Sequence, residues 1–317
     1  MTFACIGAVD AMHNTLDWVA RGGQERNRIG IVVFADNAKY DLGSSGEYTQ
    51  GAGGGAILIR HNPRLLAIPD IWGVSTMPVH DFFKPRREIE TRTVVENVLE
   101  LAEESGARFT SNLAEKILKL LPRSKKKNQT IFENEKIMIH KDTPVFDGQF
   151  SNRCYSESVK QAFIDFRRNA IEEGRYNPED DEILTNQWSR IIVHLPYAFQ
   201  GKRMFPDVFR HDRRNLPMWE GIVEEIGPEP LPSEFPDTPE GIEEFETAND
   251  AYRRLISKTP EFKTFVEQRI EKTQRASSLI GNQYTGSIFL ALMSAMESDY
   301  IENVEMEGSH IGLCGYG

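Results

Sequence analysis

Residues 28–36, with the sequence RIGIVVFAD, form a continuous apolar run rich in β-branched residues. Such a run predicts a strand that is buried on both faces. Before it, apolar residues recur at helical spacing over residues 8–19, and the Gly22-Gly23 pair ends the pattern. A second buried strand is predicted at 189–195 (SRIIVHL). Strands and helices alternate in this way along the chain, which indicates a layered α/β fold.

Other elements follow from the same signals. Two helix starts are predicted at Thr238-Pro239-Glu240 and Thr259-Pro260-Glu261, because each places a capping hydroxyl before a proline and an acid. The glycines at 51–55 lack the ending of a phosphate-binding loop and are expected to allow close backbone packing. Strands are also predicted at 56–59 and 311–314, helices at 94–104, 111–121, 154–173 and 283–297, and an exposed loop at 123–128 that contains Lys125, Lys126 and Lys127.

Composition excludes several classes of protein. The chain has 317 residues, of which 39% are hydrophobic and 27% charged, and these fractions are typical of a folded globular protein. Its net charge of −11 argues against general nucleic-acid binding. The 3 cysteines fit neither a disulfide framework nor a metal site, so a reducing cytoplasm is the expected location. His61, His80 and His140 fit no metal-ligand spacing, and no apolar run is long enough to cross a membrane. We therefore expect no metal and no membrane association.

Three polar residues lie where one element gives way to another: Cys5, His194 and Asn282. Cys5 precedes a predicted helix, where unpaired N–H groups and the helix dipole are expected to stabilise its thiolate. Each residue also has a purely structural explanation. A cysteine packs as a small hydrophobe, a histidine at a strand end bonds locally, and an asparagine caps a helix. Together they supply a nucleophile, an imidazole and an amide donor, which acyl transfer through a thioester requires.

Several segments of the chain match the sequence motifs of one enzyme family. One of them, Gly46-Glu47-Tyr48-Thr49-Gln50-Gly51-Ala52-Gly53, is similar to the family motif Gly-Glu-Pro-Thr-Gln-Gly-Ala-Gly. The other matching segments are Ala4-Cys5 with its helix, Asp36-Asn37-Ala38-Lys39-Tyr40, Asp81-Phe82-Phe83-Lys84-Pro85, Pro144-Val145-Phe146-Asp147-Gly148 with Ser151 and Cys154-Tyr155, His194-Leu195-Pro196-Tyr197, and Gly281-Asn282-Gln283-Tyr284-Thr285-Gly286-Ser287. With these segments, from Ala4 to Gly317, the chain resembles 3-hydroxy-3-methylglutaryl-CoA (HMG-CoA) synthase, a condensing enzyme family of the thiolase superfamily.

The resemblance implies a thiolase-like αβαβα fold built from two similar halves. Residues 1–90 would be the remainder of the first half, and 142–317 the second half with a helical insertion at 225–275. Residues 91–141 would form connecting helices and a loop, and all of 1–317 would be one domain. By the same comparison, the start of the first half and the end of the second are absent, so the chain is expected to be truncated.

The family also implies an activity. Cys5 would carry the acetyl group of acetyl-CoA as a thioester, whose methyl would attack the ketone of acetoacetyl-CoA before water released the product. His194 would donate a hydrogen bond at the acetoacetyl thioester, and Asn282 would position a substrate carbonyl. Thr49 and Ser151 match positions near the coenzyme and substrate, and Lys202 or Arg203 matches a basic position that pairs with a coenzyme A phosphate. The resemblance implies an acyltransferase of the mevalonate (isoprenoid) pathway, a homodimer, and no cofactor beyond the coenzyme A thioesters.

The chain departs from the family pattern near its ends. Phe3 and Ile6 replace an asparagine and an aromatic residue beside Cys5, and Gly315 replaces a serine. The family's general acid/base, a glutamate roughly thirty residues before the cysteine, precedes Met1. Two rival functions therefore stay open: a related synthase that acts on acyl groups tethered to carrier proteins in polyketide β-branching, and a non-catalytic relative that binds acyl-CoA or a partner subunit.

Overall fold

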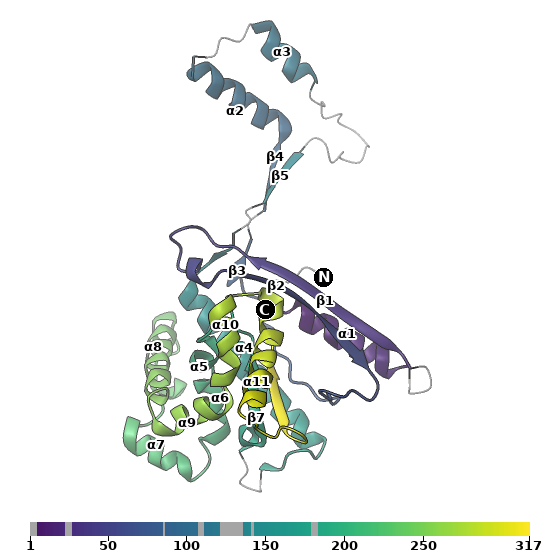
Figure 1. The fold of residues 1–317 in the computed structure, drawn as a ribbon. Coiled ribbons are helices and arrows are strands. Elements are labelled where there is room, and N and C mark those ends of the chain that lie inside the picture. The colour runs from purple at the N-terminus through teal and green to yellow at the C-terminus, as the bar shows by residue number, and fades with distance from the viewer. Residues whose placement is uncertain are drawn as a thin grey trace. The chain divides into compact units, whose positions relative to one another are not determined.

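The structure is a computed structural model that describes residues 5–22, 27–84, 86–106, 111–120, 136–140, 143–178 and 183–317. The chain divides into two compact units, which are described separately (Figure 1). The larger consists of Met1–Asp81 and Asp147–Gly317, and the smaller is Phe82–Phe146. The predicted lysine loop at 123–128 lies outside the described residues. The division into two halves and an insertion stays a prediction.

The larger unit begins with helix α1 (Gly7–Ala20), which packs on an antiparallel pair of strands. These are β1 (Ile29–Ala38) and β2 (Gly51–Arg60), and their register runs from the Ile29–Arg60 pair to the Ala38–Gly51 pair. Met12 and Val19 of α1 contribute to a small core with Val32 and Ile59. The helical spacing predicted from the sequence is therefore the spacing of the face that packs on this sheet (Figure 1).

Strand β1 is not buried on both faces as predicted. Ile29, Ile31 and Val33 are 50%, 64% and 73% exposed, whereas Val32 is buried. The reason is that, within the described residues, α1 packs on the face that carries Val32, while alternate residues point to the opposite face. A continuous apolar run predicts a strand but does not show whether other elements cover both faces.

Strand β2 starts earlier than the predicted 56–59, because the glycine-rich stretch belongs to the strand. A Cβ atom added to Gly53 would lie 2.3 Å from the side chain of Gln283, and one added to Gly51 would lie 2.7 Å from the backbone nitrogen of Asn282. Glycines therefore allow the close approach that was predicted, and the segment they approach contains Asn282.

A parallel pair forms the other main sheet of this unit. It consists of β7 (Trp188–Val193) and β8 (His310–Cys314), with Val193 paired to Cys314. Ile191, Ile192 and Val193 are almost completely buried, and α9, α10 and α11 lie against the strand (Figure 1). The two strands predicted at 189–195 and 311–314 are thus confirmed, and β7 forms the centre of the larger core.

The remaining elements of the larger unit are helical. The helices are α4 (Gly148–Glu172), α5 (Gln200–Met204), α6 (Pro206–Arg213), α7 (Met218–Ile226), α8 (Pro239–Ile256), α9 (Pro260–Arg269), α10 (Glu271–Ile280) and α11 (Ser287–Ile301). The described part of this unit also contains the short 3-10 turns η2 (Glu47–Thr49), η5 (Leu184–Gln187), η6 (Pro232–Glu234) and η7 (Tyr284–Gly286).

Both predicted helix starts are confirmed. The hydroxyl of Thr238 accepts a hydrogen bond from the backbone N–H of Gly241 at 3.2 Å, and that of Thr259 accepts one from Phe262 at 3.3 Å. The helix predicted from residue 283 instead begins at Ser287, because η7 comes first and places Tyr284 at a φ of 44°. This turn belongs to the candidate site described below.

A buried ion pair joins β7 to α11. Arg190 Nε donates to Asp299 Oδ2 at 2.9 Å, and Lys272 Nζ of α10 lies 2.8 Å from Asp299 Oδ1. The side chains of Arg190 and Asp299 are only 10% and 3% exposed, so each charge depends on the other for its stability.

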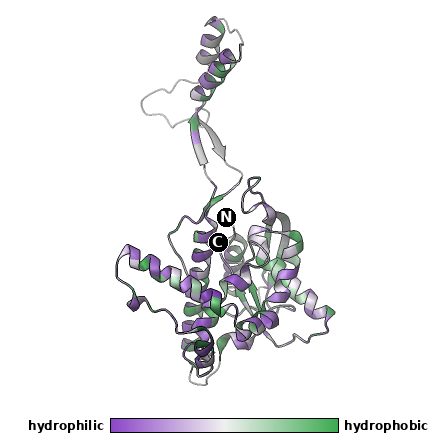
Figure 2. Cartoon of the chain, turned by 90° about the vertical axis from the view of Figure 1, so that its left-hand side faces the viewer, coloured by the Kyte–Doolittle hydropathy of each residue, from purple (hydrophilic) through white to green (hydrophobic). Residues whose placement is uncertain are grey.

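In the smaller unit, the described residues form two short antiparallel pairs and two helices. Strand β3 (Phe82–Phe83) pairs with β6 (Val145–Phe146), and β4 (Arg86–Glu90) pairs with β5 (Lys136–His140). The helices are α2 (Thr91–Glu104) and α3 (Ser111–Leu120), which carry both hydrophobic and hydrophilic residues (Figure 2). Val98 and Leu101 of α2 are exposed. Among the described helices of either unit, none combines the length and the apolar character that a membrane span requires.

Candidate active site

Cys5 lies two residues before the start of α1, and distant segments of the chain hold this end of the helix. The backbone N–H of Ala8 donates to the Thr285 hydroxyl of η7 at 2.5 Å, so this hydroxyl satisfies one of the helix's unpaired N–H groups. A Cβ atom added to Gly317 would lie 2.8 Å from Cβ of Cys5. The half-buried thiol is therefore packed against the last residues of the chain.

The pKa of Cys5 differs from the sequence prediction. The helix start was expected to stabilise the thiolate, but burial raises the pKa of the thiol to about 12, and the negative charges of Asp36 and Asp81 add to this rise. Loss of hydration and two nearby carboxylates outweigh the helix dipole, so the thiol is protonated at neutral pH. Any reaction at Cys5 must therefore begin by removing this proton.

His194 follows β7 and is only 1% exposed. Its backbone N–H donates to the Cys314 carbonyl at 3.0 Å, and its own carbonyl accepts from the Tyr155 hydroxyl at 2.5 Å. Neither ring nitrogen has a hydrogen-bond partner in the part of the chain that the structure describes. Burial lowers the pKa of the imidazole to about 3, so it is neutral at physiological pH. The structural explanation of His194 is therefore not supported, because its ring makes no local hydrogen bond.

Asn282 is also buried, and its side chain has several partners. Its Oδ1 accepts hydrogen bonds from the Tyr284 backbone N–H at 2.7 Å and from the Ser287 hydroxyl at 3.1 Å. Its Nδ2 donates to the Tyr40 hydroxyl at 3.2 Å, and its backbone N–H donates to the Thr49 carbonyl at 2.9 Å. Asn282 thus organises the turn before α11 rather than capping the helix directly. The Tyr40 hydroxyl thus accepts one of the two N–H donors that an amide carries.

A group of tyrosines joins these residues. The rings of Tyr155 and Tyr316 stack with centroids 4.2 Å apart, and Tyr155 lies 6.3 Å from the His194 ring. Burial raises the pKa of Tyr155 and of Tyr40, and in both cases the nearby Cys5 adds to the shift. Tyr155 therefore links Cys5 to His194, while Tyr40 links Cys5 to Asn282. The three residues singled out from the sequence surround one region.

Ser151 and Thr49 each bond to residues of this cluster or beside it. The Ser151 hydroxyl donates to Asp81 Oδ2 at 3.3 Å, and the same carboxylate accepts a hydrogen bond from the Tyr316 hydroxyl. Thr49 donates its hydroxyl to the Gly46 carbonyl at 2.7 Å. Both predicted substrate-binding residues thus lie at the cluster, where their hydroxyls help to organise polar groups.

Lys202 and Arg203 lie on α5 and are both exposed. Lys202 Nζ is 4.5 Å from the centroid of the Phe199 ring, and the Arg203 guanidinium is 5.7 Å from that of Tyr197. Neither cation forms an ion pair with a carboxylate among the described residues. Tyr197 follows His194 by three positions in the chain and adds to the rise in the pKa of Tyr155.

Sequence reasoning assigned no role to several residues of the cluster. Asp36, Tyr40, Asp81 and Tyr155 all lie inside the motifs that carry the family resemblance, so a signal was present. Only the fold shows that they gather around Cys5. Tyr316 directly follows Gly315, which replaces a serine of the family pattern, but nothing in the local sequence predicts that its ring stacks on Tyr155.

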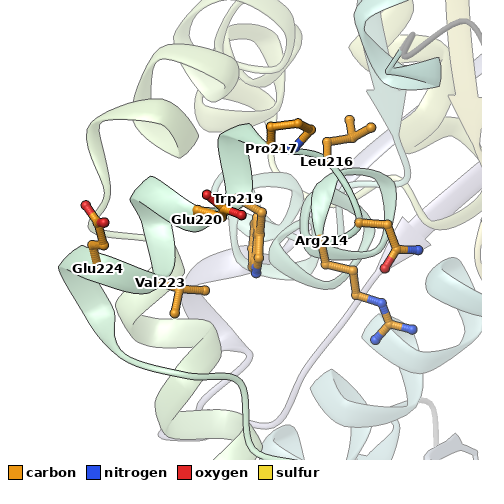
Figure 3. Close-up of a pocket in the computed structure, with 8 residues that line it drawn as sticks. Arg214, Leu216, Pro217, Trp219, Glu220, Val223 and Glu224 are labelled. Carbon is orange, nitrogen blue, oxygen red and sulfur yellow. The ribbon is translucent and has the colours of Figure 1, made fainter.

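The described residues offer no metal-binding group, and a separate pocket lies away from the cluster. No group of three histidine, cysteine, aspartate or glutamate side chains is placed to hold a metal ion among the described residues. A pocket of about 520 Å³ lies beside α7 and shares no residue with the cluster (Figure 3). It is lined by Arg214, Asn215, Leu216, Pro217, Trp219, Glu220, Val223 and Glu224.

The fold is thiolase-like. The structure superposes on a solved structure described as MvaS in complex with 3-hydroxy-3-methylglutaryl coenzyme A, with a TM-score of 0.64 and 22% identity, over 100% of this chain and 55% of the other. The curacin biosynthetic pathway HMG synthase, in complex with acetyl donor-ACP, gives a TM-score of 0.57 at 13% identity, over 100% of this chain and 51% of the other.

Residues 129–317 match the family model for the hydroxymethylglutaryl-coenzyme A synthase C terminal, and the chain belongs to this family. It is 25% identical over 315 residues to hydroxymethylglutaryl-CoA synthase of Haloferax volcanii, which covers 99% of this chain and 55% of that protein. The corresponding protein of Enterococcus faecalis is 26% identical over 99% of this chain and 52% of its own length. The chain therefore spans about half the length of these relatives.

Proposed function

We propose that this chain carries the acyl-transfer centre of an HMG-CoA synthase. The observation that carries the proposal is the His194 ring, which is buried, neutral and without a hydrogen-bond partner for either nitrogen among the described residues. An unbonded polar group inside a protein costs stability, so its retention favours a role in ligand binding. The Tyr155 ring lies 6.3 Å from this ring, and the nearby Cys5 adds to the rise in the pKa of Tyr155.

In the proposed reaction, Cys5 Sγ attacks the carbonyl carbon of acetyl-CoA. The bond from that carbon to the coenzyme sulfur breaks, and the proton of Cys5 leaves with coenzyme A as its thiol. The acetyl methyl then gives a proton to a general base, a role that the family resemblance assigns to a glutamate roughly thirty residues before the cysteine. The resulting carbanion adds to the ketone carbon of acetoacetyl-CoA, whose oxygen takes up a proton. Water finally cleaves the bond to Cys5 and releases HMG-CoA.

His194 and Asn282 act as neutral donors in this scheme. The imidazole N–H of His194 donates to the acetoacetyl thioester, and the second amide N–H of Asn282 donates to a substrate carbonyl. Buried donors of this kind need no reorganisation when charge develops on oxygen, and each is typically worth about 10²–10³-fold in rate. The exposed cations Lys202 and Arg203 pair with coenzyme A phosphates in an otherwise acidic protein.

Incubation with acetyl-CoA followed by peptide mass spectrometry tests the proposal. We expect an acetyl adduct on Cys5, its loss in Cys5→Ala, and its retention in His194→Ala, which should lose condensation with acetoacetyl-CoA. Normal condensation by His194→Ala would contradict the role of the imidazole. The proposal also includes a homodimer, a cytoplasmic location and no cofactor beyond the coenzyme A thioesters. Size-exclusion chromatography with light scattering tests the homodimer, and cell fractionation tests the location.

A second candidate is a module that binds acyl-CoA without turnover. The raised pKa of Cys5 favours it, because a protonated thiol is a poor nucleophile. In that case acetyl-CoA binds to the folded chain, but no adduct forms on Cys5 at any pH at which the chain stays folded.

A related synthase that acts on carrier-bound substrates would give a different result, because the adduct on Cys5 would form only from an acetylated carrier protein.

A further inference from the structure

Helices α4 and α6 pack against each other in the larger unit, and two contacts show how they are aligned. The Ser156 hydroxyl donates to Asp207 Oδ2 at 2.7 Å, and further along both helices the rings of Phe163 and His211 meet edge to face with centroids 6.2 Å apart. Since the second contact is C-terminal to the first on both helices, α4 and α6 run in the same direction here. The ring contact therefore fixes where the next turn of each helix lies.

One turn beyond this ring contact, each helix carries an arginine. Arg167 lies four residues after Phe163 on α4, and Arg214 lies three residues after His211, where the backbone is still helical. Residues three or four apart share a helix face, so both guanidinium groups belong to the face that contains His211. The pKa of the imidazole agrees with this placement, because it is lowered to about 4 by burial and then by the positive charges of Arg214 and Arg167.

Two of these cations lack an acceptor. Arg167 forms no ion pair among the described residues, its Nε is buried without a hydrogen-bond partner, and its Nη2 lies 3.5 Å from the Tyr176 hydroxyl. Within the same described residues, the half-buried His211 ring has an aromatic contact but no hydrogen bond. A buried N–H group without an acceptor costs stability, so these donors favour a bound anion.

The nearby carboxylates have other partners. Glu229 is shared between Arg214, at 3.1 Å, and Arg210, at 3.8 Å. Asp212, which opposes the fall in the pKa of the imidazole, accepts hydrogen bonds from a backbone N–H and a hydroxyl through Oδ2. Lys160 of α4 adds to that fall, and its own ion pair is with a carboxylate of the same helix. This face thus has an excess of positive charge, although the chain as a whole carries −11.

From this arrangement we infer that Arg167, His211 and Arg214 form a binding site for a phosphate group. A guanidinium presents its N–H donors as a planar fork that matches phosphate oxygens, and an imidazole beside it adds a further donor. A phosphate, either free or as a monoester, supplies the acceptor that Nε of Arg167 lacks. The site shares no residue with the candidate active site, so it does not depend on the proposed function.

Isothermal titration calorimetry of the 317-residue chain with inorganic phosphate, at constant ionic strength, tests this site. Arg167→Gln should weaken binding by about tenfold or more, because it removes hydrogen bonds to a charged group. Arg214→Gln should also weaken binding, and it alters a side chain that is 42% exposed and is not needed to fill the core. Arg168→Gln is the matched control, because Arg168 is the next residue of α4, is exposed and pairs with Asp165.

Two further measurements identify the ligand and the site. Phenyl phosphate, titrated in the same way, distinguishes the sources, since tighter binding than inorganic phosphate assigns a monoester and weaker binding assigns the free ion. Histidine NMR reports on the site itself. A bound anion favours the imidazolium, so saturating phosphate should raise the pKa of His211 above about 4 in the parent and in Arg168→Gln, but not in Arg167→Gln.

Three results would overturn the site. The first is no phosphate binding by the parent chain, and the second is equal binding by Arg167→Gln and Arg168→Gln. The third is loss of binding in Lys202→Gln together with retention in Arg167→Gln, which would place the phosphate at the cations of α5 instead. An unchanged urea midpoint in Arg214→Gln confirms that its loss of binding does not come from unfolding.

Discussion

The backbone N–H of Ala8 donates a 2.5 Å hydrogen bond to the hydroxyl of Thr285, although the two residues are 277 positions apart. This bond ties the first turn of the Cys5 helix to the turn that contains Asn282. The nucleophile and the amide donor are thus positioned by one shared contact, and neither segment alone could hold this geometry.

Replacing Thr285 should disturb both sides of this contact. Thr285→Val keeps the shape of the side chain but leaves the buried Ala8 N–H without an acceptor, which costs about 1–3 kcal/mol. We expect a lower urea midpoint and slower acetylation of Cys5. Thr285→Ser keeps the hydroxyl and serves as the control. Equal stability of the valine and serine variants would show that the hydrogen bond contributes nothing.

The negative charge of Asp81 should lower the rate at which the Cys5 thiol is alkylated. Since Asp81 helps to raise the pKa of the thiol, Asp81→Asn should lower that pKa and increase the thiolate fraction. We expect Cys5 to react with iodoacetamide at pH 8 about three- to tenfold faster, because one pKa unit changes the fraction tenfold. Peptide mass spectrometry distinguishes Cys5 from Cys154 and Cys314. Asp70→Asn, an exposed carboxylate of the same unit, should change nothing.

His194 should make the fold sensitive to acid. Its pKa is about 3 in the folded chain and 6.5 when exposed, so below pH 6.5 the unfolded chain binds a proton that the folded chain does not. Stability is therefore lost as the pH falls from 6.5 towards 3, and the loss reaches about 2 kcal/mol at pH 5.

Urea unfolding at pH 7.5 and pH 5 measures this loss. His194→Gln should lose about 2 kcal/mol less than the parent between the two values, whereas His310→Gln, an exposed residue of β8, should behave as the parent does. If His194→Gln and the parent lost the same free energy of unfolding between pH 7.5 and pH 5, the imidazole would already be protonated in the folded chain at pH 5.

The Asp299 carboxylate should be needed for stability. Asp299→Ala leaves the buried Arg190 without its counter-charge and should reduce the free energy of unfolding by about 3–5 kcal/mol. Asp17→Ala removes the exposed Asp17–Arg21 pair, whose atoms are 3.9 Å apart, and should cost at most about 1 kcal/mol. Comparable losses in the two variants would contradict the difference in burial.

Sequence patterns predicted those helices and strands well whose ends depend on contacts between residues close in sequence. The caps at Thr238 and Thr259 form as expected, because a hydroxyl reaches the N–H groups of the next turn whatever the rest of the chain does. The predicted start of α11 is four residues too early. The turn that precedes the helix is organised by hydrogen bonds that the Asn282 side chain accepts from Tyr284 and Ser287. Those bonds depend on side-chain placement and leave no periodic pattern.

The sequence by itself determined the layered α/β character, the ordered motifs and the choice of Cys5, His194 and Asn282. Spacing, capping and residue type act over a few positions and can be read without coordinates. Only the tertiary structure determined the pKa values, and so the charges, of the residues at the site. The pKa of Cys5 depends on burial and on Asp36 and Asp81, which lie 31 and 76 positions away in sequence. It also decided that β1 has one exposed face, because burial depends on what other parts of a protein cover.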